Sequence, residues 1–158
     1  MKKILFFALI LFLTAIAMSS CEREDYAEWK LLNEQWWKDN KEALENEGYQ
    51  TTESGLMYRI EYMGPEGHRH PNNNSRIFIS YTGKLIDGST FDSGEDKEMF
   101  MAGVIRGWTE GLKKIRDGGI IHLYVPYTLG YGKDGGGGGY IPPYSTLYFE
   151  IDLLYSEN

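Results

Sequence analysis

The chain has 158 residues, of which 42% are hydrophobic and 15% aromatic, enough for one domain with a hydrophobic core plus a short additional segment. This composition excludes an intrinsically disordered protein. The formal net charge is −7 and no basic cluster follows Lys2-Lys3, so nucleic acid is not an expected partner. The single cysteine, Cys21, excludes an intramolecular disulfide.

Residues 1–20 have the three parts of an export signal. Lys2-Lys3 forms a basic start, residues 4–17 are apolar, and small residues lead to Cys21. The apolar stretch is too short to span a bilayer comfortably, and it lacks the polar face of a buried amphipathic helix. The run Ala17-Met18-Ser19-Ser20-Cys21 resembles the lipobox of bacterial lipoproteins, in which the cysteine is lipidated and becomes the first residue of the mature protein.

This resemblance implies a protein of the cell envelope, held by the lipid on Cys21 to a bacterial membrane and either periplasmic or surface-exposed. The cysteine is followed directly by Glu22, Glu24 and Asp25. Such acidic clusters resemble sorting signals of some double-membraned bacteria, and they equally suit a solvated tether. In both cases we expect the folded domain to work outside the cytoplasm.

Residues 26–47 show the apolar spacing of an amphipathic helix. Asp25 and Glu28 suit a capping box at its start, and Gly48 predicts its end. The apolar positions are Trp29, Leu31, Leu32, Trp36, Trp37, Ala43 and Leu44. Three tryptophans on so short a helix indicate that it is docked, either against the following domain, which we favour, or against a partner or a second chain.

Alternation of apolar and polar residues predicts strands in the rest of the chain. The first has apolar Leu56, Tyr58 and Ile60 on one face and Met57, Arg59 and Glu61 on the other. Residues 77–81 alternate again, and Asp87-Gly88 before Thr90 predicts a hairpin. Two more strands are expected at 120–125 and 146–154.

One short helix is expected at residues 108–115, ending at the Asp-Gly-Gly sequence 117–119. Many strands with a single short central helix indicate an α+β domain in which a curved antiparallel sheet wraps around that helix. His68 and His70 have only His122 to join them, which is too few ligands for structural zinc, so no metal site is expected.

Four sequence blocks then follow in a fixed order. They are Tyr81-Thr82-Gly83-Lys84-Leu85 with Asp87-Gly88 and Phe91-Asp92-Ser93; Val104-Ile105-Arg106-Gly107-Trp108-Thr109-Glu110-Gly111-Leu112; Leu129-Gly130-Tyr131-Gly132; and Ile141-Pro142-Pro143 with Thr146-Leu147-Tyr148-Phe149. Any one block can occur by chance. Together, in this order and with these spacings, they resemble the FKBP family of peptidyl-prolyl cis/trans isomerases, over roughly residues 55–154.

The resemblance implies an FKBP-like curved antiparallel β-sheet around a short α-helix, which agrees with the strand pattern, and a deep aromatic pocket. Matching the blocks gives Tyr81, Phe91, Asp92, Phe100, Trp108, Tyr131 and Phe149 as catalytic residues and Val104, Ile105, Tyr140 and Ile141 as substrate-binding residues. It implies proline-containing polypeptides as substrates and no cofactor or metal. The oligomeric state is left open.

The reaction of that family needs only bond rotation. The barrier about an X–Pro bond is about 20 kcal/mol because the amide is conjugated, and no bond is broken. A dry apolar pocket favours the twisted, less dipolar amide over the planar one. The resemblance implies Trp108 as the floor of this pocket, with the Tyr131 hydroxyl and the Ile105 N–H as donors to substrate carbonyls. Asp92 is expected to be held by hydrogen bonds, or to cap a turn after Phe91.

Two features depart from the family pattern. Glu98 stands where many members have an aromatic or aliphatic residue, and the connection 100–104 is short, so the rim of the pocket is expected to differ. Gly135 to Gly139 make an unusually glycine-rich loop before Tyr140, suited either to a flexible connector or to looser substrate selection. No Lys-Ser/Thr follows these glycines, so they do not form a phosphate-binding loop.

The sequence therefore predicts a signal peptide at 1–20, a tether with a Trp-rich helix at 21–54 and an isomerase domain at 55–158. The expected function is isomerisation of prolyl bonds during the folding of exported or cell-envelope proteins. Two alternatives stay open: a non-catalytic peptide-binding module with the same fold, and an anchored scaffold that uses mainly the Trp-rich helix. No GxSxG or Ser-His-Asp order suggests hydrolysis.

Overall fold

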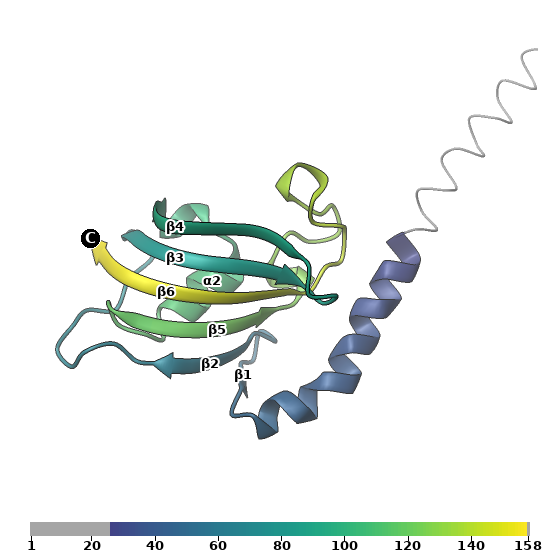
Figure 1. Cartoon of the computed structure of the whole chain (residues 1–158), viewed down its shortest axis with the longest axis horizontal. Helices are drawn as coiled ribbons and strands as arrows, with labels where there is room; N and C mark the ends of the chain where they lie inside the picture. The colour runs from purple at the N-terminus through teal and green to yellow at the C-terminus, as the bar shows by residue number, and fades with distance from the viewer. Residues whose placement is uncertain (1–25, 158) are drawn as a thin grey trace, which may run out of the picture.

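The computed structural model describes residues 26–157, which form a six-stranded sheet, a short helix against it and a long helix across one end (Figure 1). The strands are β1 (Gln50–Thr51), β2 (Met57–Tyr62), β3 (Arg76–Leu85), β4 (Thr90–Phe100), β5 (Gly119–Val125) and β6 (Leu147–Glu157). They lie in the order β1-β2-β5-β6-β3-β4, and every neighbouring pair is antiparallel.

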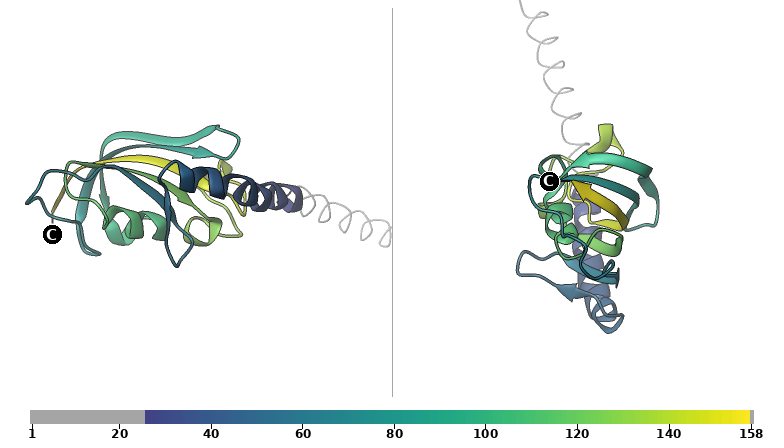
Figure 2. Two further views of the ribbon diagram at one scale, coloured as in Figure 1. Left: turned by 90° about the horizontal axis from the view of Figure 1, so that it is seen from below. Right: turned by 90° about the vertical axis from the view of Figure 1, so that its left-hand side faces the viewer.

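The short helix α2 (Arg106–Leu112) lies against one face of this sheet, and the sheet curves around it (Figure 2). Three 3₁₀ turns complete the connections: η1 (Met101–Gly103), η2 (Tyr127–Leu129) and η3 (Gly137–Gly139). The predicted α+β fold, a curved antiparallel sheet around a short helix with another helix before it, is confirmed.

The β3–β4 hairpin forms where the Asp87-Gly88 pair predicts it. Gly88 has φ +84°, which favours glycine, and its N–H donates to the Leu85 carbonyl over 3.0 Å. The Asp87 carboxylate accepts from the Ser89 N–H at 2.9 Å, a local bond typical of Asp in turns. This turn joins two long neighbouring strands, β3 and β4, and so sets the register of the sheet half that carries the site.

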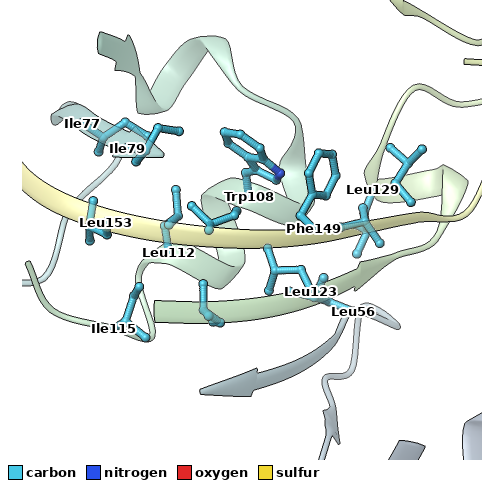
Figure 3. Packing of buried hydrophobic residues seen from close by; sticks show 14 of the residues in the cluster. Leu56, Ile77, Ile79, Trp108, Leu112, Ile115, Leu123, Leu129, Phe149 and Leu153 are labelled. Atoms are coloured by element: carbon cyan, nitrogen blue, oxygen red, sulfur yellow. The ribbon is translucent and has the colours of Figure 1, made fainter. Parts of the chain in front are cut away.

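The hydrophobic core lies between α2 and the sheet (Figure 3). Side chains at alternate positions of the central strands point toward the helix, so Ile79 on β3 and Leu153 on β6 are fully buried neighbours across the sheet. Trp108 and Leu112 meet them from α2, one helical turn apart, and Ile115 follows just beyond the helix. The predicted spacing of these three residues is thereby confirmed as a core face.

The N-terminal helix occupies residues 26–46 and ends at Gly48, close to the predicted 26–47. The Gly48 N–H donates to Glu45 O at 3.1 Å and the Tyr49 N–H to Leu44 O at 3.0 Å, which is the Schellman arrangement with its glycine at φ +92°. Leu44 and Tyr49 are both buried beside each other, the apolar contact that accompanies this cap. The chain then turns directly into β1.

This helix packs on the domain, which confirms the interpretation favoured from the sequence. It crosses the end of the sheet where β5 ends and β6 begins (Figure 1). Trp36 contacts the Tyr124 ring at 5.0 Å between centroids and the Trp37 ring at 5.3 Å. Met57, predicted on the polar face of its strand, is fully buried instead, because the helix covers that face and packs with Met57 in a second apolar cluster.

The predictions for the first 25 residues lie outside the described part of the chain: the signal segment 1–20, the lipidated Cys21 and the capping role of Asp25. Between residues 26 and 157, no helix combines the length and the apolar character needed to cross a membrane. The sheet begins at Gln50, so two residues of the predicted 21–54 extension belong to it.

The core contact of α2 with the sheet gives a first prediction. Leu112→Ala removes a fully buried side chain and leaves a cavity, so the free energy of unfolding should fall by about 2–5 kcal/mol. Urea unfolding followed by far-ultraviolet circular dichroism measures this change. Leu31→Ala is the control, because Leu31 is 64% exposed and its loss should cost less than about 0.5 kcal/mol.

Candidate active site

A cavity of about 170 Å³ opens between the inner face of the sheet and the N-terminal end of α2. The residues around it come from β3, β4, β6, α2 and the loops that follow η1 and η2. They are Tyr81, Asp92, Met99, Gly103, Val104, Ile105, Trp108, Tyr131 and Phe149. Seven of the eleven side chains predicted for the site, Tyr81, Asp92, Val104, Ile105, Trp108, Tyr131 and Phe149, are therefore brought together here.

Trp108 is the floor of the cavity and also part of the core, with only 5% of its surface exposed. Its ring meets Tyr81 and Phe149 edge to face, each at 5.0 Å between centroids, an arrangement that aromatic quadrupoles favour. Within residues 26–157, the buried indole N–H has no conventional acceptor. Figure 3 shows that nitrogen on the side of the indole that faces Phe149.

A hydrogen bond fixes the two polar side chains at the mouth of the cavity. The Tyr81 hydroxyl donates to Asp92 Oδ2 at 2.8 Å, and the Ser93 N–H donates to Asp92 Oδ1 at 2.9 Å. Burial raises the pKa of Tyr81, and the bond to Asp92 raises it further. Burial, with a smaller effect of the Asp92 charge, also raises the pKa of Tyr131. Both phenols therefore stay protonated and able to donate at neutral pH.

A bulge in β4 places two adjacent residues on the inner face. Phe91 and Asp92 lie where β3 offers one partner, Gly83, so both side chains turn inward. A Cβ at Gly83 would lie 2.7 Å from the Phe91 ring and 2.8 Å from the Phe149 ring. Phe91 does not line the cavity itself. It packs behind Phe149, edge to face at 5.6 Å, and supports that wall.

A second bulge corrects the prediction for Phe100. Between Gly94 and Lys97 β4 has one residue more than β3, and Asp96 takes the left-handed φ of +48°. The extra residue reverses which side chains face inward. Phe100 is therefore on the outer face and 58% exposed, with the Arg76 guanidinium 5.8 Å from its ring.

Met99 takes the place in the cavity that the sequence assigned to Phe100. Pairing Met99 with buried Ile77 puts it on the inner face. Glu98 lies outside as well, where its carboxylate accepts from Arg76 at 3.1 Å, so it does not alter the rim. The short connection after β4 forms η1 and brings Gly103 and Val104 to the cavity.

Tyr140 and Ile141 do not line the cavity either. Tyr140 follows the η3 turn on the surface and is 77% exposed. Ile141 is 3% exposed, because its backbone pairs with Gly136 and its side chain enters the core. The glycine run thus has a structural role: a Cβ at Gly136 would lie 2.4 Å from Tyr131 Cδ1, so only glycine leaves room for that ring.

The arrangement suits binding and orientation rather than bond cleavage. Its floor and walls are aromatic or aliphatic, and its polar groups are two tyrosine hydroxyls and one carboxylate that already accepts two hydrogen bonds. Such a cavity can hold a small apolar ring while a tyrosine hydroxyl hydrogen-bonds to polar groups attached to that ring. Fold and cavity together define an α+β domain with a small aromatic binding cavity.

Comparison with known proteins gives the family. A family model described as FKBP-type peptidyl-prolyl cis-trans isomerase matches residues 67–154. FkpA of Escherichia coli (strain K12), an FKBP-type peptidyl-prolyl cis-trans isomerase, is 42% identical over 127 residues, which are 77% of this chain and 46% of FkpA. The FKBP-type 22 kDa isomerase of the same strain is 45% identical over 118 residues, 72% of this chain and 56% of that protein.

The crystal structure of FkpA from Escherichia coli has a TM-score of 0.85 to this chain at 35% identity, covering 96% of this chain and 71% of that one. The chain belongs to the family of FKBP-type peptidyl-prolyl cis-trans isomerases. It spans about half the length of the curated relatives it matches.

The raised pKa of Tyr81 predicts how stability depends on pH. The folded state keeps the phenolic proton at a pH where the unfolded chain loses it, so this stabilisation is complete below about pH 10 and is lost as pH rises further. The free energy of unfolding should therefore fall above about pH 10, and less steeply in Tyr81→Phe. Urea unfolding at a series of alkaline pH values measures the slope. Exposed Tyr62→Phe is the control, and equal slopes in wild type and Tyr81→Phe would contradict the prediction.

Proposed function

We propose that the chain catalyses cis/trans isomerisation of X–Pro bonds in polypeptides. The observation that carries this proposal is the aromatic cavity over Trp108 in a member of the isomerase family. The cavity is of a size to receive one proline ring, and its mouth carries protonated tyrosine hydroxyls beside it. The reaction needs no nucleophile, metal or cofactor, since rotation breaks no bond.

Catalysis follows from preferential binding of the twisted amide. The planar ground state is dipolar and well hydrated, whereas the twisted state has lost conjugation and polarity. Enclosure by Trp108, Phe149 and Val104 removes water from the prolyl bond and so raises the planar form relative to the twisted one. The aromatic walls, held edge to face, do not rearrange when the substrate rotates.

Two donors orient the peptide in this proposal. The Tyr131 hydroxyl, on a half-exposed side chain at the rim, donates to one substrate carbonyl. The Ile105 N–H, at the N-terminal end of α2, donates to another. Asp92 acts through Tyr81, because its two oxygens are engaged by the Tyr81 hydroxyl and the Ser93 N–H. It is therefore a positioning residue rather than a base.

The substrates we propose are exported or cell-envelope proteins during folding. The support is the sequence of residues 1–21, with its basic start, apolar stretch and lipobox-like end at Cys21. An acylated Cys21 holds the protein at a bacterial membrane, because each methylene of the fatty acyl chain buried in the bilayer contributes about 0.8 kcal/mol of binding free energy. A folding enzyme tethered there meets chains as they emerge or cross the envelope.

The activity is tested by following cis-to-trans conversion of short X–Pro peptides with protein that begins at Glu22. Wild type should accelerate the conversion. Trp108→Leu and Tyr131→Phe should each lower kcat/KM by about tenfold or more, the effect of losing about 1.4 kcal/mol of transition-state stabilisation.

Phe100→Ala serves as the control, because this aromatic side chain lies outside the cavity and its loss should leave kcat/KM within about twofold of wild type. A folded wild-type sample that accelerates no peptide, over several residues before proline, would refute the proposal. Binding of the same peptides without acceleration would instead indicate a non-catalytic peptide-binding module.

The anchor is tested separately with Cys21→Ala in cells. Wild type should sediment with membranes and carry the mass of a lipid on its first residue, whereas Cys21→Ala should lack that mass. Intact-protein mass spectrometry and immunoblots of the membrane and supernatant fractions report both properties. An unmodified wild-type protein, with or without cleavage after residue 20, would contradict lipidation.

A further inference from the structure

The N-terminal half of the long helix is hydrogen-bonded to the turn that precedes β6, residues 142–146. The Trp29 indole N–H donates to Ser145 Oγ at 2.9 Å, across 116 positions of sequence. The Trp37 indole N–H donates to Thr146 Oγ1 at 2.8 Å. Each indole thus donates its one N–H to a residue of this turn, so apolar packing alone does not explain the placement of the two tryptophans.

Asn33 makes the buried link between the same two elements. It is 3% exposed, and its amide bridges helix and turn: Nδ2 donates to Trp29 O at 2.9 Å, and Oδ1 accepts from the Thr146 N–H at 2.7 Å. The Thr146 N–H is itself in a residue only 1% exposed, so an unmade bond there would leave a buried donor unsatisfied. The helix therefore supplies the partner that the start of β6 needs.

The turn that receives these bonds is strained. Tyr144 has φ +63°, a conformation that a bulky side chain rarely adopts and that persists only where the surroundings impose it. Its ring is held between the Tyr127 ring, at 5.3 Å, and the Lys30 ammonium of the helix, 5.2 Å from the ring centroid. Contacts from the helix thus help to hold the turn in its unfavourable conformation.

The strained 142–146 turn is hydrogen-bonded to the loop that carries Tyr131. The Tyr144 N–H donates to Gly132 O at 2.9 Å, next to Tyr131 in the chain. Gly136 exchanges two backbone hydrogen bonds with Ile141, at 3.0 and 3.1 Å, and its missing Cβ makes room for the Tyr131 ring. A continuous set of bonds therefore joins the helix, the turn and the rim of the cavity.

We propose that Trp29, Asn33 and Trp37 are positioning residues for the isomerase site. They fix the 142–146 turn and through it the Tyr131 hydroxyl at the rim of the cavity. This inference rests on the proposed function for its kinetic consequence, and on the loop geometry for its structural one. The long helix is then part of the working enzyme rather than a spacer.

The role predicts a particular kinetic effect. Tyr131 addresses a substrate carbonyl in both the planar and the twisted amide, so a loosened Tyr131 weakens binding of both. Such a loss raises KM more than it lowers kcat. Asn33→Ala should raise KM for a tetrapeptide about fivefold and change kcat less than about twofold. Trp29→Phe, which keeps an aromatic ring but removes the indole donor to Ser145, should change KM in the same direction.

Asn40→Ala is the matched control. The Asn40 amide makes the same bond four residues back along the helix, to Trp36 O at 2.8 Å, but it makes none to the turn among residues 26–157. Asn40→Ala therefore removes the same bond within the helix as Asn33→Ala does but leaves the bond to Thr146 intact, so KM should stay within about twofold of wild type. An equal rise of KM in both variants would reduce the effect to general helix stability and overturn the proposal.

Hydrogen exchange measured by NMR gives a readout independent of activity. In Asn33→Ala the amides of Gly136, Ile141 and Tyr144 should exchange about tenfold faster than in wild type, while central amides of β5 and β6 stay protected. Unchanged exchange at these three amides would overturn the proposal even if KM rose. If wild type isomerises no peptide but the exchange pattern follows this prediction, the proposed function fails and the positioning role stands.

Discussion

The structure depends on the packing of one indole. Trp108 belongs to the hydrophobic core on one side and forms the floor of the cavity on the other, so the same ring serves both the core and the site. Its two edge-to-face contacts, with Tyr81 and Phe149, join the central strands to the start of α2. The sheet curves around the helix that carries the ring (Figure 2), and the bulges of β4 place Asp92 and Met99 on the inner face. A flat sheet with the same residues would leave no enclosed space over the indole.

The site is suited to excluding water from a bound group rather than to breaking a bond. A site that breaks bonds would need a nucleophile and a base with matched pKa values, whereas the two tyrosines here are held in the protonated form, which donates hydrogen bonds. Burial raises the pKa of both Tyr81 and Tyr131 and so keeps them protonated. Asp92 accepts hydrogen bonds from the Tyr81 hydroxyl and the Ser93 N–H. The protein contributes a mostly apolar cavity, and in the proposed reaction the substrate contributes the rotation.

The sequence predicted the fold because its local signals agree with one another. Asp87-Gly88 specifies the hairpin, the spacing of Trp108, Leu112 and Ile115 specifies the core face of α2, and the order of the four blocks fits both. Phe100 was misplaced because strand alternation holds only without bulges, and the polar residues 95–98 give no sign of where the extra residue lies. Adjacent apolar Met99 and Phe100 then cannot be told apart by pattern.

Met57 was misplaced because its burial depends on a helix that docks from outside the sheet. The bonds of Asn33 and Trp29 join residues more than one hundred positions apart, which no local pattern records.

The strained turn at Tyr144 has a thermodynamic consequence. In the positioning role proposed above, helix docking and peptide binding would both order the loop that carries Tyr131, so the two events would be linked equilibria with one shared coupling free energy. Whatever factor the docked helix adds to the affinity for a prolyl peptide, a bound peptide adds to the docking of the helix.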